Sequence, residues 1–353
     1  MLLPQKMLAA VFHSPKVITL EERQLSKTEN GIFIRVNACA VCGYDARVFR
    51  NGHQKVRTPV ILGHELCGET LETIRVNNGK VIESGTRVVV CPIISCLNCK
   101  YCKSEQYNLC TNLREIGSTV DGGFAQYVSI PEEILRIGGI VPVPSDLSNE
   151  EAALVEPLAC CMNGFNQMGR INCENQVAII GDGPIGLLHL QLSKLYGAKT
   201  IIIGKNAERI RKAKSIGADQ VIFAHDLKQT KDNILGYTNG LGVNAVIIAT
   251  SNPDALNLAM AIASKNSKIN IFAGMPKETH ISIDPNWLHY NQISLIGSFS
   301  STPDMLQEAV RLAANKQIDL GKIISHRFSL DSIEEAIEVT EQYYGLRAVI
   351  NSF

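Results

Sequence analysis

Short apolar runs alternate with amphipathic stretches in the second part of the chain, and this alternation predicts a parallel β-sheet. The apolar runs lie at Gln176–Ile180, Thr200–Ile203, Gln220–Phe223, Ala245–Ala249, Lys268–Phe272 and Ile293–Ile296. Helical periodicity separates several of them, at Pro184–Tyr196, Ala207–Ile216 and Asp254–Ala263. Strands that alternate with helices form right-handed βαβ units. We therefore expect an α/β fold with a doubly wound, six-stranded parallel sheet in residues 151–297, and a loop at Thr230–Gly240.

The two ends of the chain have a different pattern, which predicts a second, β-rich domain. Short strands separated by Gly, Pro and Asn are expected at Gly31–Val36, Arg87–Val90 and Gly123–Ile130. The tail has helical patterns at Pro303–Asn315 and Ser332–Tyr343 and a strand-like segment at Arg347–Ile350. Because the tail is too short to bury a core of its own, we expect it to pack on the first part. The predicted domains are residues 1–150 completed by 298–353, and residues 151–297.

Composition and charge exclude several classes of protein. The 353 residues include 34 Lys and Arg that balance 34 Asp and Glu, and 45% of them are hydrophobic. A net charge of zero lacks the basic surface of a dedicated nucleic-acid binder. The sequence has no run of about 18 apolar residues, and its N-terminal segment does not have the pattern of an export signal. We expect a cytoplasmic protein without a membrane span, whose partner is a small molecule.

Four closely spaced cysteines predict a structural metal site. Cys96, Cys99, Cys102 and Cys110 lie within fifteen residues. Four thiolates suit a closed, tetrahedral Zn²⁺ site, which stabilises a short lobe without taking part in chemistry. An iron–sulfur cluster uses the same ligands, but nothing else in the sequence indicates electron transfer. Other cysteines are expected to be buried apolar thiols, namely Cys39, Cys67, Cys91 and Cys173.

A second group of residues predicts an open metal site. Cys42 and the pair His64 and Glu65 offer sulfur, nitrogen and oxygen donors, and a later carboxylate, Glu156, could join them or bind their water. Three mixed ligands with one open position are typical of catalytic zinc. Asp45 is a suitable partner for the imidazole of His64, because a metal-bound histidine donates its other N–H group. A single His or Cys is more often structural, so this prediction depends on the combination.

A glycine-rich loop after the first apolar run predicts dinucleotide binding. The loop reads Gly181, Asp182, Gly183, Pro184, Ile185 and Gly186. Between a strand and a helix, the first glycine makes the tight turn, the second lets the backbone approach a pyrophosphate, and the third lets helix and strand pack closely. A tight turn without a ligand is the alternative interpretation.

The coenzyme is predicted to be NADP, with NAD possible. NAD-binding folds carry Asp or Glu at the end of the second strand, where it accepts hydrogen bonds from the ribose 2′-hydroxyl. This chain has Gly204 there, followed by the cations Lys205 and Arg209. An uncharged residue with two nearby cations suits a 2′-phosphate. The alternative is that both cations belong to the solvated start of a helix.

Together these motifs resemble the zinc-dependent medium-chain alcohol dehydrogenases over nearly the whole chain. The likeness includes Gly63-His64-Glu65, the four-cysteine lobe, Gly123 with Phe124–Tyr127, Glu156-Pro157-Leu158 and the glycine loop. The Glu-Pro-Leu motif is similar to that of the sorbitol, threonine and related polyol dehydrogenases. The resemblance implies a GroES-like catalytic domain, a Rossmann domain, two zinc ions per chain, and a homodimer or homotetramer.

Three departures from the family pattern affect the expected substrate and proton path. Tyr44 stands where the family places Ser or Thr at the start of a proton relay, so its hydroxyl is a candidate shuttle or its bulk narrows the pocket. Arg47 replaces a frequent histidine, and it is either a surface cation or a contact for an anionic substrate such as a sugar phosphate. The segment Gly297–Ser301 lacks the arginine of sorbitol dehydrogenases, which argues against sorbitol itself.

The resemblance implies reversible oxidation of a secondary alcohol to a ketone, in the polyol, sugar or sugar-phosphate class. A catalytic zinc ion makes an alcohol hydroxyl more acidic, and a nicotinamide accepts the hydride. The alternative is a sensor or structural protein that binds zinc and NADP without turnover. The intact set of Cys42, His64 and Glu65 favours an enzyme.

Overall fold

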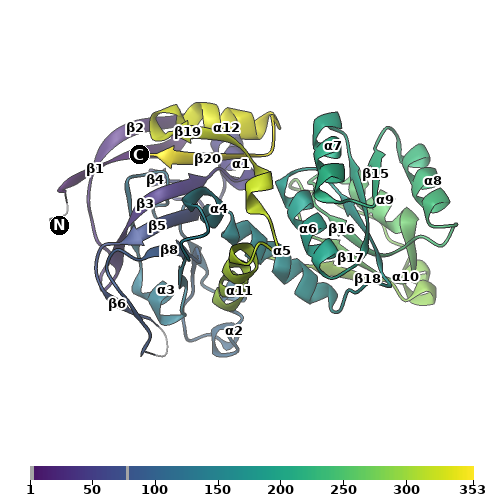
Figure 1. Cartoon of the computed structure of the whole chain (residues 1–353), viewed down its shortest axis with the longest axis horizontal. Coiled ribbons are helices and arrows are strands. Elements are labelled where there is room, and N and C mark those ends of the chain that lie inside the picture. The colour runs from purple at the N-terminus through teal and green to yellow at the C-terminus, as the bar shows by residue number, and fades with distance from the viewer. Residues whose placement is uncertain (1–3, 77–78) are drawn as a thin grey trace. The chain divides into compact units, whose positions relative to one another are not determined.

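A computed structural model describes residues 4–76 and 79–353, which divide into two compact units (Figure 1). The first unit extends to Ala159 and includes Ser301–Phe353, and the second is Cys160–Ser300. The junctions differ slightly from the expected boundaries at residues 150 and 297. The first junction lies inside a continuous helix, α5 (Val155–Met168), so no break in the pattern marks it in the sequence.

The first unit is built on a seven-stranded sheet with the order β12-β8-β5-β3-β20-β19, in which β11 also pairs with β3. Its strands are β3 (Ile32–Ala40), β5 (Glu65–Thr70), β8 (Arg87–Val90), β11 (Tyr127–Ile130), β12 (Ile140–Pro142), β19 (Ile324–Ser329) and β20 (Arg347–Ser352). The smaller sheets contain β1 (Lys6–Ser14), β2 (Val17–Gln24), β4 (Val60–Ile61), β6 (Ile74–Arg75), β7 (Val81–Ile82), β9 (Ile93–Ile94) and β10 (Arg114–Glu115). The strand expected over Gly123–Ile130 begins only at Tyr127.

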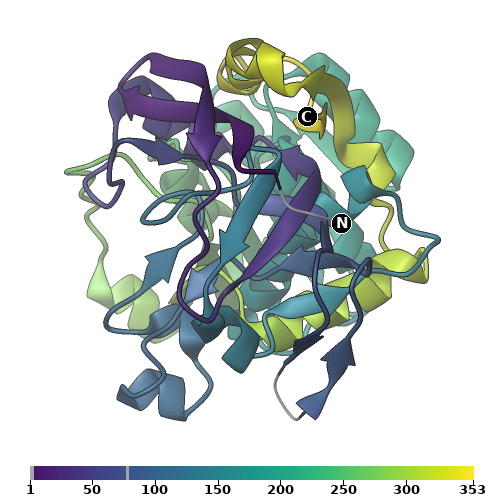
Figure 2. The ribbon, with the colours of Figure 1, turned by 90° about the vertical axis from the view of Figure 1, so that its left-hand side faces the viewer.

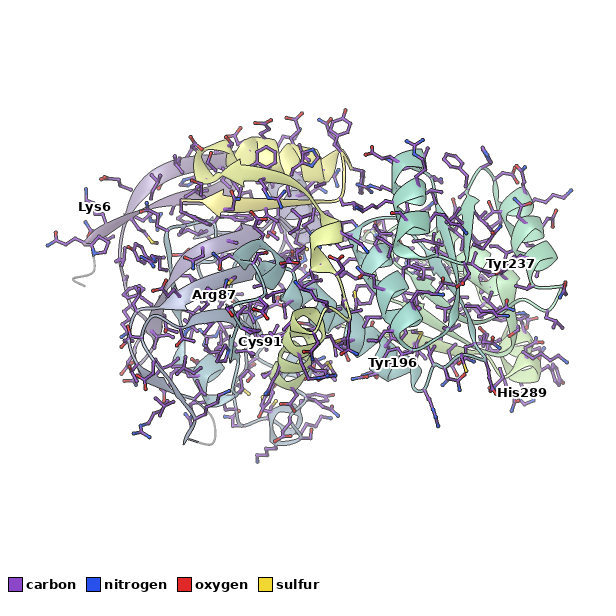
Figure 3. All side chains as sticks on the ribbon, viewed as in Figure 1. Lys6, Arg87, Cys91, Tyr196, Tyr237 and His289 are labelled. Atoms are coloured by element: carbon purple, nitrogen blue, oxygen red, sulfur yellow. The ribbon has the colours of Figure 1, made fainter. Side chains whose placement is uncertain are left out.

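Short helices connect these strands and cover the sheet. They are α1 (Gly43–Asn51), α2 (Lys100–Lys103), η2 (Tyr107–Leu109), α3 (Glu132–Arg136), α4 (Asn149–Ala153), α11 (Pro303–Ala314), η3 (Leu320–Ile323), η4 (Leu330–Ser332) and α12 (Ile333–Glu341). Arg87, labelled in Figure 3, holds one connection in place, because its guanidinium donates to the carbonyls of Pro144 and Leu147 and to the side chain of Asn149.

The C-terminal tail is an integral part of the first unit's sheet. Strand β20 pairs antiparallel with β3 through Val349 opposite Ala40, and it pairs parallel with β19. The first strands in purple and the tail in yellow lie side by side in both Figure 1 and Figure 2. Ile350, which is fully buried, belongs to the same apolar core as Phe12 and Phe124.

The second unit contains a six-stranded parallel sheet with the order β15-β14-β13-β16-β17-β18, which confirms the predicted doubly wound fold. The strands are β13 (Gln176–Ile180), β14 (Lys199–Gly204), β15 (Gln220–Phe223), β16 (Val243–Ile248), β17 (Ala263–Ile271) and β18 (Ser294–Gly297). The helices are α6 (Pro184–Leu195), α7 (Ala207–Ile216), α8 (Leu227–Tyr237), α9 (Asp254–Ile262) and α10 (Pro285–Asn291). The sheet's order reverses next to β13, whose end carries the glycine loop, and ligands bind at such a switch point.

The prediction of a loop at Thr230–Gly240 was wrong, because most of this stretch forms α8. The side chain of Asp226 accepts a hydrogen bond from the Gln229 N–H and caps the first turn. Only Thr230 and Ile234, one turn apart, are buried along the helix. A pattern with so few apolar positions is too weak to be recognised in the sequence. Across residues 4–76 and 79–353, no helix has both the length and the apolar character needed to cross a membrane.

Candidate functional site

Cys42, His64 and Glu65 come together because two paired strands end beside each other. Cys42 follows β3 and caps the N-terminus of α1, while Glu65 begins β5 and lies opposite Ala40 of β3. One donor atom from each of the three side chains lies within 4.8 Å of the other two. Sulfur, imidazole nitrogen and carboxylate oxygen are the donors of catalytic zinc sites.

Asp45 connects two members of this group. Its Oδ2 accepts the backbone N–H of Cys42 at 2.9 Å, and its Oδ1 lies 3.5 Å from Nδ1 of His64. The first contact follows from the position of Asp45 in the first turn of α1, where its side chain reaches back to the cap residue Cys42. The carboxylate therefore lies beside Nδ1 of the imidazole, the position from which a carboxylate can orient a histidine that binds metal through its other nitrogen.

Burial and neighbouring charges change the pKa of each donor. Burial alone would raise the pKa of the Cys42 thiol, but the hydrogen bond and charge of His64 lower it to about 7. Burial alone would lower the pKa of His64, but the Asp45 carboxylate holds it well above its ordinary value. Burial raises the pKa of Glu65 well above its usual range, although Arg347 acts in the opposite direction. A thiol with a pKa near 7 is readily converted to the thiolate that binds metal.

Arg347 is a buried cation beside these donors, and the sequence analysis missed it. Its Nη2 lies 3.3 Å from Oε1 of Glu65, and its Nη1 donates to the carbonyl of Val41 at 3.1 Å. The residue begins β20 and is only 3% exposed. In the sequence, an arginine at the start of an apolar strand is expected to be a solvent-exposed residue at the end of that strand. Only the pairing of β20 with β3 brings it to the site.

Glu156 lies outside the group formed by the other three donors. It is buried near the start of α5. Burial raises the pKa of Cys91, a thiol labelled in Figure 3, and the charge of Glu156 adds to this shift. Its part in metal binding stays a prediction. Tyr44 lies next to the donor group, since its ring centroid is 5.9 Å from that of His64 and its hydroxyl is 3.5 Å from Nδ1 of His53.

The four clustered cysteines also converge, on the loop between β9 and β10. One sulfur from each of Cys96, Cys99, Cys102 and Cys110 lies within 4.8 Å of the others. The loop's ends are held close because β9 and β10 pair antiparallel. Backbone N–H groups of Thr111 and Cys102 lower the pKa of the Cys99 thiol to about 5.

Of the cysteines expected to be buried outside this cluster, three are buried and one is not. Cys39, Cys67 and Cys91 lie in the core of the first unit, but Cys173 is exposed, so the expectation for it was wrong. It lies in a turn that the side chains of Asn172 and Asn175 close by hydrogen bonds to the backbone. Such a turn runs over the surface.

The donor chemistry of both groups fits zinc. The four-cysteine group offers a closed tetrahedral set, and the mixed group offers three ligands. Within the described residues, Oε2 of Glu65 is buried and has no hydrogen-bond partner. Buried polar atoms normally have a partner, and a bound cation at this position would supply one.

The glycine loop has the backbone geometry of a dinucleotide site. Gly181 has φ of +127°, and a Cβ added there would lie 2.7 Å from the carbonyl oxygen of Ala249. At Gly186 an added Cβ would lie 1.9 Å from the carbonyl oxygen of Gly181. Gly183 caps α6, Pro184 occupies the first helical turn, and Ile185 follows it. The loop therefore presents backbone N–H groups and a helix N-terminus to a phosphate.

The residues that predicted NADP lie next to this loop. Gly204 ends β14, which pairs with β13. Lys205 is exposed, and Arg209 is buried in the first turn of α7. A Cβ added to Gly183 would lie 3.8 Å from Nη1 of Arg209, so this cation reaches the glycine loop. Asp182 lies directly beside Gly204, since a Cβ added to Gly204 would lie 2.1 Å from Oδ2 of Asp182. The sequence analysis assigned Asp182 no role.

Comparison with known proteins identifies the family. Residues 28–144 match the family described as the alcohol dehydrogenase GroES-like domain, and residues 184–315 match the zinc-binding dehydrogenase family. The chain is 32% identical over 333 residues to D-arabitol-phosphate dehydrogenase of Enterococcus avium, covering 92% of this chain and 91% of the relative. It is 30% identical to sorbitol dehydrogenase of Bacillus subtilis, covering 96% and 95%.

A solved structure extends the likeness to the whole fold. A zinc-binding dehydrogenase of Sinorhizobium meliloti with NADP bound is 30% identical and has a TM-score of 0.89, covering 99% of this chain and 100% of that one. The likeness therefore spans both units. The chain belongs to the zinc-dependent medium-chain dehydrogenases, among their alcohol and polyol dehydrogenases, and is an NAD(P)-dependent enzyme of that family.

Proposed function

We propose that this enzyme reversibly oxidises a secondary alcohol of a polyol, sugar or sugar phosphate to a ketone and transfers the hydride to NAD(P). The observation that supports it most is the convergence of Cys42, His64 and Glu65 on one point. This group would hold a catalytic zinc ion, and the four-cysteine group would hold a second, structural one. The alternative of a sensor without turnover receives no support from the two relatives described above, which are both named as dehydrogenases.

The chain's own residues prepare the site for this reaction. When bound, zinc supplies an electrophilic centre that makes an alcohol hydroxyl more acidic, and the nicotinamide accepts the hydride. Asp45 fixes the orientation of His64, and Arg347 offsets the charge of Glu65 in the protein interior. Glu156 is proposed to act from the edge of the site, as a further ligand or as a partner of its water.

Tyr44 is the proposed proton shuttle. Its hydroxyl can pass a proton to Nδ1 of His53, at 3.5 Å, and His53 is exposed to solvent. The backbone N–H of Lys55 also donates to this nitrogen, which identifies it as an acceptor. Substitution Tyr44→Phe should lower kcat more than it changes KM, and an unchanged kcat would exclude the tyrosine from the path.

The substrate class is supported by the relatives and by one cation. The relatives named above act on a polyol phosphate and on a polyol. Arg47 is exposed on α1, five residues after Cys42, where it can meet an anionic group. We therefore propose that polyol phosphates are accepted as well as polyols.

A substrate screen tests the function as a whole. Purified enzyme loaded with zinc should reduce NAD or NADP with at least one polyol, sugar alcohol phosphate, L-threonine or simple secondary alcohol. Removal of the more labile zinc should abolish this activity. The variant Arg47→Ala should raise KM for phosphorylated substrates only, and Arg50→Ala on the same helix is the matched control. A zinc-loaded enzyme that oxidises none of these alcohols would overturn the proposal.

We also propose a coenzyme preference and an oligomeric state. A preference for NADP rests on Gly204, Lys205 and Arg209, and the ratio of kcat/KM for the two coenzymes tests it. A homodimer or homotetramer rests on the family resemblance, and light scattering of the purified protein tests it.

A further inference from the structure

We propose that Asp182, in the glycine loop, contributes to the discrimination between NAD and NADP in this enzyme by favouring NAD. The inference rests on the proposed coenzyme site. Its carboxylate takes over the position that dinucleotide-binding folds normally fill from the end of the second strand. The negative charge of Asp182 thereby counteracts Lys205 and Arg209, the two cations that favour a 2′-phosphate.

The space in front of Gly204 is already filled by Asp182. A Cβ built on Gly204 would lie 2.1 Å from Oδ2 of Asp182 and 2.4 Å from its Cβ and Cγ. Gly204 is not among the glycines with positive φ, so its backbone does not require glycine. The absence of a side chain at position 204 is therefore explained by the neighbour and not by backbone strain.

Backbone contacts hold the carboxylate at this place. Oδ2 of Asp182 accepts the N–H of Asn206 at 2.8 Å, which ties the glycine loop to the start of α7. Asn206 caps that helix, since its own side chain accepts the N–H groups of Glu208 and Arg209. The bond to Asn206 uses Oδ2, and the second carboxylate oxygen, Oδ1, can accept a donor from a ligand. The geometry is that of a fixed acceptor with one oxygen left for a ligand.

The chemistry of this acceptor separates the two coenzymes. A ribose 2′-hydroxyl can donate a hydrogen bond to a carboxylate, whereas a 2′-phosphate at the same position is repelled by its charge. Lys205 and Arg209 act in the opposite direction and attract the phosphate. Asp182 thus favours NAD, and the balance between these three charges sets the selectivity of the enzyme.

Nucleotide fragments test the proposal without any alcohol turnover. The compounds 5′-AMP and 2′,5′-ADP differ only in the 2′-phosphate, and calorimetry on the zinc-loaded enzyme measures their Kd values. Asp182→Asn keeps the shape and the acceptor for Asn206, but it removes the charge. We expect the ratio of affinities to shift by about tenfold toward 2′,5′-ADP. Glu208→Gln removes a charge from the exposed side of α7 and should leave the ratio within about twofold of the wild-type value.

Moving the negative charge from position 182 to position 204 provides a second test of the proposal. Gly204→Asp alone should weaken binding of both NADH and NADPH, because its Cβ would collide with Asp182. The double variant Asp182→Gly with Gly204→Asp should recover NADH binding, measured by the change in coenzyme fluorescence, while NADPH remains weak. An unchanged ratio in Asp182→Asn would show that the residue only packs against Gly204 and would overturn the inference. Wild-type enzyme that binds neither nucleotide would overturn the coenzyme site itself, which is a different result.

Discussion

Arg347 and Glu65 form a buried ion pair, with 3.3 Å between Nη2 and Oε1 and side chains that are 4% and 1% exposed. The arginine also donates to the carbonyl of Val41, a residue 306 positions earlier in the sequence. The pair therefore links the end of the chain to the two strands that carry the metal donors.

Removal of this cation should destabilise the fold. Arg347→Met leaves Glu65 in the protein interior without its partner, and we expect the free energy of unfolding to fall by about 3 kcal/mol. Arg327→Met, on neighbouring β19, is the matched control, because the ion pair of Arg327 with Glu150 of α4 is partly exposed and should contribute less than about 1 kcal/mol. Urea unfolding of both variants measures the difference. Equal losses would show that the buried pair has no special part in stability.

The four-cysteine group should hold one zinc ion that is required for stability. Cys99→Ser removes one of its four ligands, so the zinc content should fall by one ion per chain and the Tm should drop. Cys173→Ser, an exposed thiol in the second unit, is the control and should change neither quantity. Elemental analysis and thermal unfolding measure the two effects. Zinc content that is unchanged in Cys99→Ser would contradict the assignment of this group.

Zinc binding at the mixed group should strengthen as the pH rises. The pKa of Cys42 is about 7, and those of His64 and Glu65 are held above their ordinary values, so protons compete with the metal near neutral pH. We expect zinc binding to release more protons at pH 6 than at pH 8, and the affinity to fall toward acid pH. Calorimetry in buffers of different ionisation enthalpy counts the protons. The same count at both pH values would disprove the competition.

His189 should make the second unit sensitive to acid. Its ring is fully buried between Phe165 and Phe272, and this burial lowers its pKa from 6.5 to about 3. Between these values the unfolded chain binds a proton that the folded chain does not, so the free energy of unfolding falls as the pH falls. From pH 7 to pH 5 this contribution is about 2 kcal/mol.

A histidine variant separates this contribution from general acid sensitivity. His189→Leu should lose about 2 kcal/mol less stability than the wild type over this pH range, as measured by urea unfolding. His225→Leu changes an exposed histidine of the same unit and should keep the wild-type pH dependence. Parallel stability curves for the wild type and His189→Leu would refute the prediction.

Local patterns in the sequence were sufficient to predict the fold and the two groups of donor side chains that converge in the structure. The strand at Gln176–Ile180 and the helix at Ala207–Ile216 were placed correctly, because strong apolar periodicity defines both. Cys96 and Cys99 are close in sequence, so their spacing alone indicates a shared ion. His64 and Glu65 are adjacent, and a single register of β5 places both near Cys42.

Contacts between distant segments could not be predicted in the same way. Arg347 has no local feature that distinguishes it from a surface arginine, and its burial depends on strand pairing across the whole chain. Asp182 stands at a variable position of the glycine motif, so its relation to Gly204 emerges only from the distances between them. Both residues modify the chemistry of motifs that were recognised without them.

The position of β20 between β3 and β19 has a consequence for biosynthesis. The ribosome makes the metal donors early, then the entire dinucleotide-binding unit, and only afterwards the strand that brings Arg347 to Glu65. A nascent chain therefore contains Cys42, His64 and Glu65 before it contains Arg347, the cation that pairs with Glu65. If the proposed metal sites are correct, the mixed group is expected to bind its metal after release from the ribosome, whereas the four cysteines, which are all local, can bind theirs during translation.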